Sequence, residues 1–148
     1  MKNSRFICKY RFIMLSAVFG IVLLIVVTAF FSIDSSTNKM IVEYIEDIGW
    51  EIEDSPTEIS HLTIPENFDA VYQTYNALQK QSGLSFENFK GKKVTRYTYR
   101  VLNHKESHKS QVVAGVFVFE NTIIGADISS ADSNGFMHAI TDTTNMQE

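Results

Sequence analysis

An uncharged run of 22 residues near the N-terminus, Phe12 to Ile33, constrains this chain more than any other feature. As an α-helix at about 1.5 Å per residue, the run would be about 33 Å long, which matches a hydrocarbon core of roughly 30 Å. A lone strand could not cross there, because its backbone N–H groups would have no partner in lipid. The run therefore predicts a transmembrane helix.

The charges before this run predict its orientation. Four basic residues and no acidic residue precede it: Lys2, Arg5, Lys9 and Arg11. The positive-inside rule places residues 1–11 in the cytoplasm as a basic tail and everything after the run on the outer side. We therefore expect a single-pass signal-anchor in the cell membrane, with an extracytoplasmic C-terminal domain.

A cleaved signal peptide is the alternative reading of the same run. Residues 27–29 (Val-Thr-Ala) resemble a small-residue cleavage site, and cleavage near Ala29 would give a secreted protein. Signal peptides usually have apolar regions of about 7–15 residues, whereas this run continues to Ile33. The length favours an uncleaved anchor, and both readings remain open.

The rest of the chain is acidic. Residues 34–148 contain nine Lys and Arg against seventeen Asp and Glu, a net charge of −8. This balance argues against a nucleic-acid partner, which usually requires a basic surplus. The one cysteine, Cys8, precedes the apolar run, so a disulfide framework and a Cys-rich zinc site are excluded. We expect a linker at 34–38, one domain at 39–140 and a flexible tail at 141–148.

The spacing of apolar residues predicts two helices in this domain. The first runs from Lys39 to Ile48, with apolar residues at i, i+3, i+4 and i+7. The second opens at Pro65, where the missing N–H costs nothing, and is closed by Gly83. Its apolar face is formed by Phe68, Val71, Tyr72, Tyr75 and Leu78.

Alternating and continuous apolar segments predict five strands, and the segment Phe136–Ile140 is expected to pack back onto them. Residues 111–119 are apolar on both faces, as in a central strand, and a turn at Glu120-Asn121 follows. The fold class is therefore α+β, in the order α-β-β-α-β-β-β, with an antiparallel sheet and the helices packed on one face. The predicted strands are 50–53, 58–64, 93–102, 111–119 and 122–129.

An ordered set of short motifs runs through this region. It includes Gly49-Trp50-Glu51, Ile64-Pro65-Glu66, Tyr75-Asn76, Arg96-Tyr97-Thr98-Tyr99 and Gly135-Phe136-Met137-His138. In these motifs, residues 39–140 resemble the bacterial domain-of-unknown-function family 4830. The resemblance implies a fold and a location, and it implies no chemistry because the family carries no established activity. The hairpin Val116–Ile128 is also faintly similar to PepSY-like domains, which are small exported sensory or inhibitory domains.

Asp127 and His138 are the leading candidates for chemistry. Asp127 lies in an otherwise apolar strand, where its carboxylate must reach solvent or a partner. Arg96 and Arg100 have side chains long enough to reach it across the central strand. We expect these residues to form a structural polar cluster, with a binding or catalytic site as the alternative.

Tyr97 and Tyr99 belong to the same candidate cluster. Together with Tyr72 and Tyr75 they are expected to form the contact between the second helix and the sheet. The alternative is an aromatic surface that binds a peptide or a glycan.

Recognisable catalytic and metal-binding motifs are missing. The segment His104–His108 has its Glu one place too late for the zinc motif His-Glu-x-x-His, so it predicts a solvated loop. No Ser-His-Asp arrangement, phosphate-binding glycine loop or dinucleotide motif is visible. We expect a protein that is not an enzyme, with no catalytic residues, no metal and no cofactor.

Three functions remain in order of preference. The first is a membrane-anchored extracytoplasmic binding, sensing or assembly module, whose partners are the bilayer and an unknown envelope protein, in an unknown oligomeric state. The second is a PepSY-like inhibitor or partner of an exported protease, which would use an exposed edge strand. The third is an envelope hydrolase that uses Asp127 and His138, which requires both side chains in one cleft.

Overall fold

The centre of the fold is a pair of strands buried on both faces. β3 (Val112–Phe119) and β4 (Thr122–Ser130) are antiparallel, and residues 114–118 and 124–128 are all buried. Glu120 and Asn121 join them in a two-residue turn with φ angles of 45° and 62°. Positive φ at both positions matches the twist of paired strands, so the predicted hairpin is confirmed.

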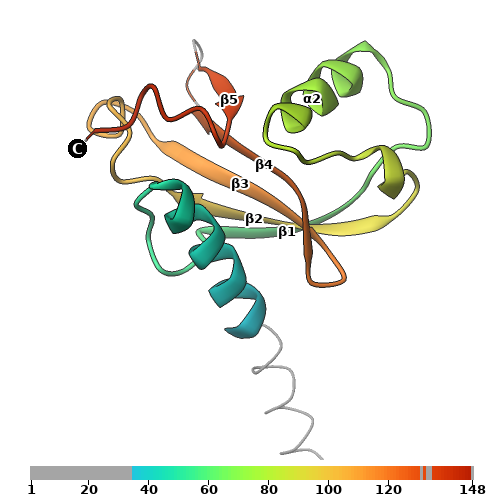
Figure 1. Cartoon of the computed structure of the whole chain (residues 1–148), viewed down its shortest axis with the longest axis horizontal. Coiled ribbons are helices and arrows are strands. Elements are labelled where there is room, and N and C mark those ends of the chain that lie inside the picture. The colour runs from blue at the N-terminus through green and yellow to red at the C-terminus, as the bar shows by residue number, and fades with distance from the viewer. Residues whose placement is uncertain (1–34, 131, 133–134, 148) are drawn as a thin grey trace, which may run out of the picture. The chain divides into compact units, whose positions relative to one another are not determined.

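A computed structural model describes residues 35–130, 132 and 135–147 of the chain. The chain divides into two compact units, Met1–Thr37 and Asn38–Glu148. The second unit contains a five-stranded antiparallel sheet in the order β1-β2-β3-β4-β5 (Figure 1). Its remaining strands are β1 (Glu58–Thr63), β2 (Lys93–Arg100) and β5 (Met137–Ala139).

The predicted fold class needs correction. The expected transmembrane helix, residues 12–33, lies outside the described residues. Within the part of the chain that the structure describes, no helix is long and apolar enough to cross a bilayer. The described residues form a small α+β fold with a five-stranded antiparallel sheet and two α-helices.

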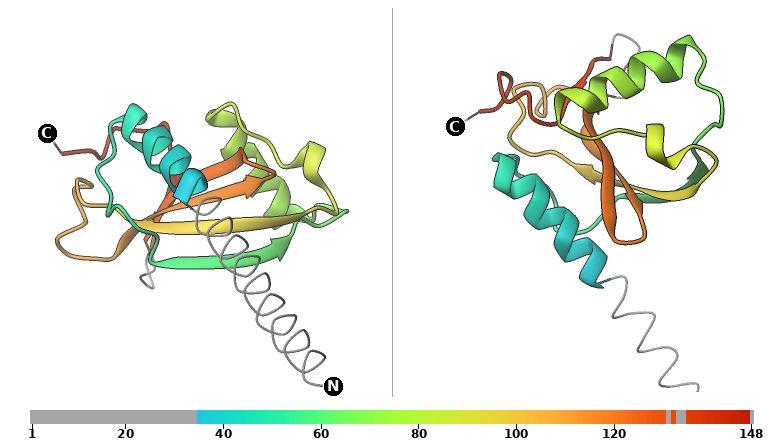
Figure 2. Two further views of the ribbon diagram at one scale, coloured as in Figure 1. Left: turned by 90° about the horizontal axis from the view of Figure 1, so that it is seen from below. Right: turned by 45° about the vertical axis from the view of Figure 1, so that its right-hand side comes forward.

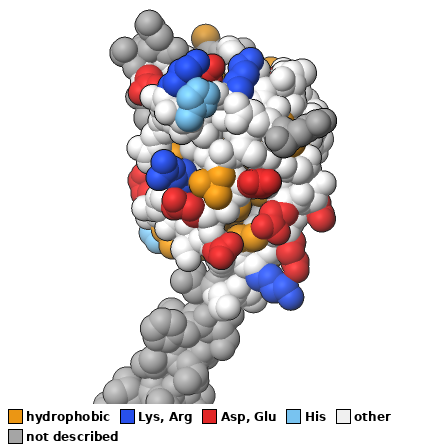
Figure 3. Space-filling view, turned by 90° about the vertical axis from the view of Figure 1, so that its left-hand side faces the viewer, with side chains coloured by type: hydrophobic (Ala, Val, Ile, Leu, Met, Phe, Trp, Pro, Cys, Tyr) orange, Lys and Arg blue, Asp and Glu red, His pale blue; other side chains and the backbone are white. Residues whose placement is uncertain are grey.

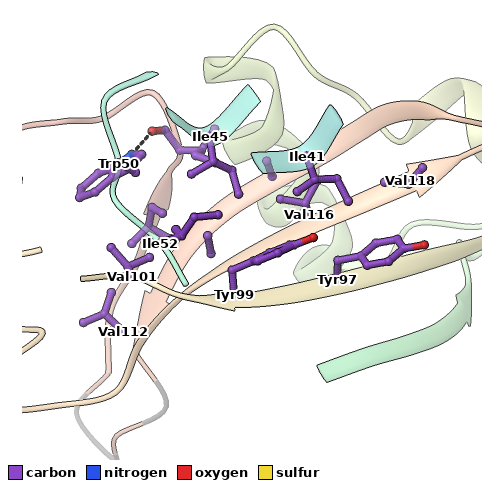
Figure 4. Close-up of a cluster of buried hydrophobic side chains, with 14 residues drawn as sticks. Ile41, Ile45, Trp50, Ile52, Tyr97, Tyr99, Val101, Val112, Val116 and Val118 are labelled. Atoms are coloured by element: carbon purple, nitrogen blue, oxygen red, sulfur yellow. Dashed lines mark hydrogen bonds between the residues drawn. The ribbon is translucent and has the colours of Figure 1, made fainter. Parts of the chain in front are cut away.

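One face of the sheet is covered by a helix over residues 35–48. Its Ile41 and Ile45 are completely buried, as their spacing predicts, and Figure 4 shows them above the two tyrosines of β2. In the described part of the chain, residues 35–38 are helical where the sequence predicts a linker. The core on this face includes Tyr97, Tyr99, Ala114, Val116, Ala126 and Ile128.

The opposite face is covered by α2 (Ala70–Gln81) and a short 3-10 turn, η1 (Glu87–Phe89). The right-hand view of Figure 2 shows the sheet between the two helices. The prediction of both helices on one face is therefore wrong. Side chains alternate along a strand, so strands that are apolar on both faces need a cover on each. The second core contains Ile64, Phe86, Val94, Phe117 and Ile124.

α2 starts later than predicted, and it is rotated about its axis relative to the predicted orientation, so a different side of it lies against the sheet. The side chain of Asp69 accepts a hydrogen bond from the Tyr72 amide at 2.8 Å and caps the helix, so Pro65 does not open it. Val71, predicted to face the sheet, is 74% exposed, whereas Asn76 and Gln79 are buried.

Hydrogen bonds explain this rotation. Oδ1 of Asn76 accepts from the backbone amide of Phe86 at 2.8 Å, and Oε1 of Gln79 accepts from that of Ala126 at 2.6 Å. β5 pairs with β4 only from Asp127 onward, so Gln79 satisfies an amide that β5 is too short to reach. A buried backbone N–H without a partner would be costly, which outweighs the exposure of Val71.

The predicted strand 50–53 is reduced to one bridge, between Ile52 and Val101. Trp50 instead turns into the core, where its indole Nε1 donates to the carbonyl oxygen of Ile140 at 2.7 Å (Figure 4). This bond ties the segment after the first helix to the C-terminal segment, which packs onto the body as predicted. The tail is also attached, because the amide of Gln147 donates to the carbonyl of Asn103 at 2.7 Å.

Gly125 permits a close approach of the Phe86 ring to β4. A Cβ atom at this position would lie 2.4 Å from the ring of Phe86. The β3–β4 register also shifts between Phe117, which pairs with Gly125, and Val118, which pairs with Ile123. A glycine at this irregularity lets the aromatic ring rest directly on the sheet.

Gly125→Ala should therefore lower the free energy of unfolding by about 1–3 kcal/mol, because the added methyl group overpacks the core. Urea unfolding measures this loss. Phe86→Leu shortens the opposing side chain and serves as the partner in a double-mutant cycle. We expect the double variant to be more stable than the sum of the two single losses allows, and strict additivity would contradict the contact.

Candidate functional site

The sheet separates the six predicted site residues into two groups. Asp127 pairs with Ala139, whereas His138 pairs with Ile128, which belongs to the core under the first helix. Paired residues point to the same face and successive residues to opposite faces, so Asp127 and His138 lie on opposite faces. Arg96 and Arg100 share the face of Asp127, whereas Tyr97 and Tyr99 share that of His138.

This separation removes the shared cleft that the hydrolase hypothesis requires. It also corrects the contact predicted for the tyrosines. Tyr97 and Tyr99 pack under the helix over residues 35–48, where the Tyr99 hydroxyl donates to Oδ1 of Asn38 at 2.8 Å. Arg100 lies at the exposed end of β2, and its Nη1 is 3.7 Å from a carboxylate oxygen of Glu53.

Asp127 is fully buried and is held by Tyr75 of α2. The Tyr75 hydroxyl donates to Oδ2 of Asp127 at 2.5 Å. Burial raises the pKa of Asp127, while the Tyr75 hydrogen bond and the positive charge of Arg96 oppose the rise. Burial also raises the pKa of Tyr75, and the charge of Asp127 adds to this rise. Tyr75 therefore remains a proton donor to the carboxyl group.

Arg96 reaches toward this pair because β3 has a glycine between them. Gly115 pairs with Thr98 on one side and with Asp127 on the other. A Cβ atom at Gly115 would lie 2.7 Å from Nη2 of Arg96, so the guanidinium occupies the space of the missing side chain. It also lies 5.6 Å from the centre of the Phe117 ring.

Because Asp127, Tyr75 and Arg96 meet there, the face of the sheet under α2 is polar at its centre. Four buried side-chain atoms there have no hydrogen-bond partner among the described residues: Nε2 of Gln79, Nε of Arg96, Oγ1 of Thr98 and Oδ1 of Asp127. The sequence indicates Asp127 and Arg96 as members of this cluster. It gives no signal for Tyr75 as the partner of Asp127, because 52 residues separate the two.

His104 and His138 form a second cluster on the other face. Their rings are stacked 5.7 Å apart, and the ring of Phe136 is 4.7 Å from that of His104 and 5.7 Å from that of His138. Trp50 closes the group at 5.8 Å from His104. His104 is only 1% exposed, so the prediction of a solvated loop is wrong at this residue.

The environment of His104 favours its neutral form. Burial lowers its pKa, and the neighbouring charges of His138 and Lys105 lower it further. Its Nδ1 accepts from the Glu106 amide at 3.1 Å. In the described ranges 35–130, 132 and 135–147, no group of three or more His, Cys, Asp and Glu side chains is placed to hold a metal ion.

Two exposed surfaces could contact other molecules. One is the outer side of α2, where a groove of about 860 Å³ is lined by α2 residues and by Met137 of β5. The other is the outer edge of β1, since β1 pairs with β2 alone among the described strands.

A family model described as "Domain of unknown function (DUF4830)" matches residues 44–128, more than half of the chain. The chain belongs to the DUF4830 family. This confirms the resemblance drawn from the sequence motifs. The comparisons with curated proteins and with solved structures gave no match.

The DUF4830 match covers one cluster more fully than the other. Tyr75, Arg96, Gly115 and Asp127 all fall within the matched residues, whereas His138 lies beyond them. The buried pair under α2 is therefore part of the DUF4830 region, and the histidine stack extends out of it.

Tyr75→Phe should lower the free energy of unfolding by about 1–3 kcal/mol at neutral pH, because it leaves a buried carboxylate without its donor. The loss should grow as pH rises through the pKa of Asp127. The folded-state pKa is raised above the unfolded value of 3.8, and removing Tyr75 raises it further, so stability is lost as pH increases. Urea unfolding between pH 4 and pH 8 measures this trend.

Tyr72→Phe, on the same helix, is the matched control, because this hydroxyl makes no bond to Asp127. A loss in Tyr75→Phe that is small and equal at all pH values would contradict a buried, ionised Asp127.

His104→Phe should flatten the pH dependence of stability on the acid side. In the wild type, unfolded His104 takes up a proton near its ordinary pKa of 6.5 while folded His104 stays neutral. The free energy of unfolding therefore falls as pH drops below about 6.5, down to the lowered folded-state pKa. Thermal unfolding at pH 7.5 and pH 5 measures the difference, with His108→Phe, at an exposed histidine of the same segment, as the control. An unchanged slope in His104→Phe would refute this assignment.

Proposed function

We propose that this DUF4830 domain is an extracytoplasmic protein-binding module without chemistry of its own. We further propose that it holds an extended segment of its partner along the outer edge of β1. The observation that carries this proposal is the open edge of a six-residue strand. The location rests on the apolar run and the charge asymmetry of the sequence.

The backbone of β1 supports strand addition. The amide of Ile64 donates to the carbonyl of Lys92 at 3.0 Å, in register with the β1–β2 pairing. Hydrogen bonding alternates along an antiparallel strand, so the backbone groups of Ile59, His61 and Thr63 point away from β2. No other described strand pairs with these groups, so they can receive an added strand.

The composition of β1 supports it as well. Natural edge strands are commonly protected by Lys, Pro or a bulge, or are very short. β1 contains no Lys, Pro or register shift, whereas the opposite edge strand, β5, has only three residues. Ile59 is 46% exposed on this edge, so an apolar side chain of the added segment has a neighbour to contact.

The titratable groups support a role without catalysis. Asp127 is buried and bound to Tyr75, and His138 is stacked against the rings of His104 and Phe136 on the other face. Both are engaged in internal packing. An exposed strand edge is also what the second candidate, a PepSY-like inhibitor or partner of an exported protease, would use.

The test places a photo-crosslinking amino acid at Thr63 of the full chain in the cells that make it. We expect a covalent adduct with a partner protein, and no such adduct from the same group at Lys105. His61→Pro removes one outward-facing N–H and so one backbone hydrogen bond to the partner. A loss of about 1.4 kcal/mol in binding free energy weakens association tenfold, so the adduct should fall about tenfold. His61→Ala, which loses the side chain but keeps the N–H, should form the adduct as the wild type does.

Equal unfolding temperatures of the two His61 variants show that the strand is intact. An adduct that survives His61→Pro unchanged, or no adduct at Thr63, would refute strand addition at β1.

A further inference from the structure

A stack of four rings holds the C-terminal segment, residues 135–147, against the rest of the domain. Phe136 and His138 of this segment stack on His104, which lies in the loop between β2 and β3. The ring of Trp50 lies 5.8 Å from that of His104 and 6.0 Å from that of His138. Three parts of the chain that are far apart in sequence therefore meet in this histidine stack.

The backbone fixes which nitrogen of each histidine carries the proton. Nδ1 of His104 accepts from the Glu106 amide at 3.1 Å, so the proton of neutral His104 is on Nε2. Nδ1 of His138 lies 3.0 Å from the carbonyl oxygen of Ala139, which can only accept, so the proton of neutral His138 is on Nδ1. An added proton can join His138 only at Nε2. It can join His104 only by displacing the Glu106 amide.

The two Nε2 atoms are buried, and neither has a hydrogen-bond partner among the described residues. A proton added to His138 would be a buried charge on a ring 5.7 Å from that of His104. A second proton, on His104, would place two positive rings in one stack and leave an amide without its acceptor. The docked stack therefore holds one added proton at most. After release of the C-terminal segment, both rings reach water and can each hold one.

Charged side chains face the stack from each neighbouring segment, and Figure 3 shows acidic, basic and histidine side chains close together at one end of the face that it displays. They belong to the loop of His104, to the segments on either side of β5 and, across the sheet, to β4: Lys105, Glu106, Lys109, Asp132, Asp142 and Asp127. Burial has the largest effect on the pKa of His104 and lowers it, and the charges of His138 and Lys105 act in the same direction. The carboxylate of Glu106 opposes them and has the smallest effect. Docking of the segment therefore disfavours protonated His104.

The attachment of the C-terminal segment to the sheet is short. β5 pairs with β4 only at residues 127–129, and it is the strand at the opposite edge of the sheet from β1. We propose that acidification releases β5 and the rest of residues 135–147 from the domain and so uncovers the outer edge of β4. The fold would then contain a pH-controlled switch, and the released form would end its sheet at β4.

Proton uptake by His104 sets the size of the effect. Released His104 binds a proton near its ordinary pKa of 6.5, whereas docked His104 stays neutral. A proton that only the released form binds favours release as pH falls, so the equilibrium constant for release should rise roughly 10- to 30-fold between pH 7.5 and pH 5.

Hydrogen exchange of the purified full chain in detergent, measured by mass spectrometry at pH 7.5 and pH 5, tests the proposal. After correction for the pH dependence of unprotected amides, residues 136–147 should lose protection roughly 10- to 30-fold at pH 5. Amides of β3 should stay more protected than this segment at both pH values, because release leaves the core folded. His104→Phe keeps a ring in the stack but takes up no proton, so its loss should be at most about threefold. His108→Phe, at an exposed histidine, should behave as the wild type.

A covalent link between the two strands provides a second variant. In a Cys8→Ser background, Ser129→Cys and Met137→Cys lie opposite each other in β4 and β5, within the reach of a disulfide. The oxidised chain should keep residues 136–147 protected at pH 5, and the reduced chain should lose protection as the wild type does.

Three results would each overturn the switch: protection of residues 136–147 that does not change with pH, a loss in His104→Phe as large as in the wild type, or β3 amides that become as exposed as the C-terminal segment at pH 5. The measurement requires no partner, so it is independent of strand addition at β1.

Discussion

The requirement to cover two apolar faces governs this structure. β3 and β4 are buried on both sides, and neither can be left against water without a large loss of hydrophobic free energy. The helix over residues 35–48 covers one side, and α2 with η1 covers the other. The two glycines of the central strands make room for side chains on the face under α2 and η1. The ring of Phe86 lies against Gly125, and the guanidinium of Arg96 lies against Gly115.

Much of the architecture could be predicted from local patterns. The hairpin at Glu120-Asn121, the four strands β1 to β4 and the inward positions of Ile41 and Ile45 all follow from periodicity and turn chemistry. The placement of the helices was wrong although its signal was present. A strand read as apolar on both faces implies a layer on each side, and the one-sided prediction conflicted with that reading.

The candidate site was harder to predict, because its contacts join distant residues. The sequence predicts that the carboxylate of Asp127 reaches either solvent or a partner, with Arg96 and Arg100 as candidates, and the structure buries it on the same face as Arg96. The bond to Tyr75 depends on the rotation of α2, which is decided by the amides of Asn76 and Gln79. Hydrophobic periodicity does not register such polar contacts. The sequence also predicts that His104 lies in a solvated loop, whereas in the structure an aromatic stack encloses it.

The short length of β5 has a further consequence. Because β5 does not extend to Ala126, a glutamine side chain from a helix occupies the position that a neighbouring strand would normally hold. The hydrogen bond from the Ala126 amide to the Gln79 side chain therefore joins the sheet to α2. The Ala126 amide proton can exchange with solvent deuterium only when α2 lifts from the sheet, so this single proton reports how often the helix undocks.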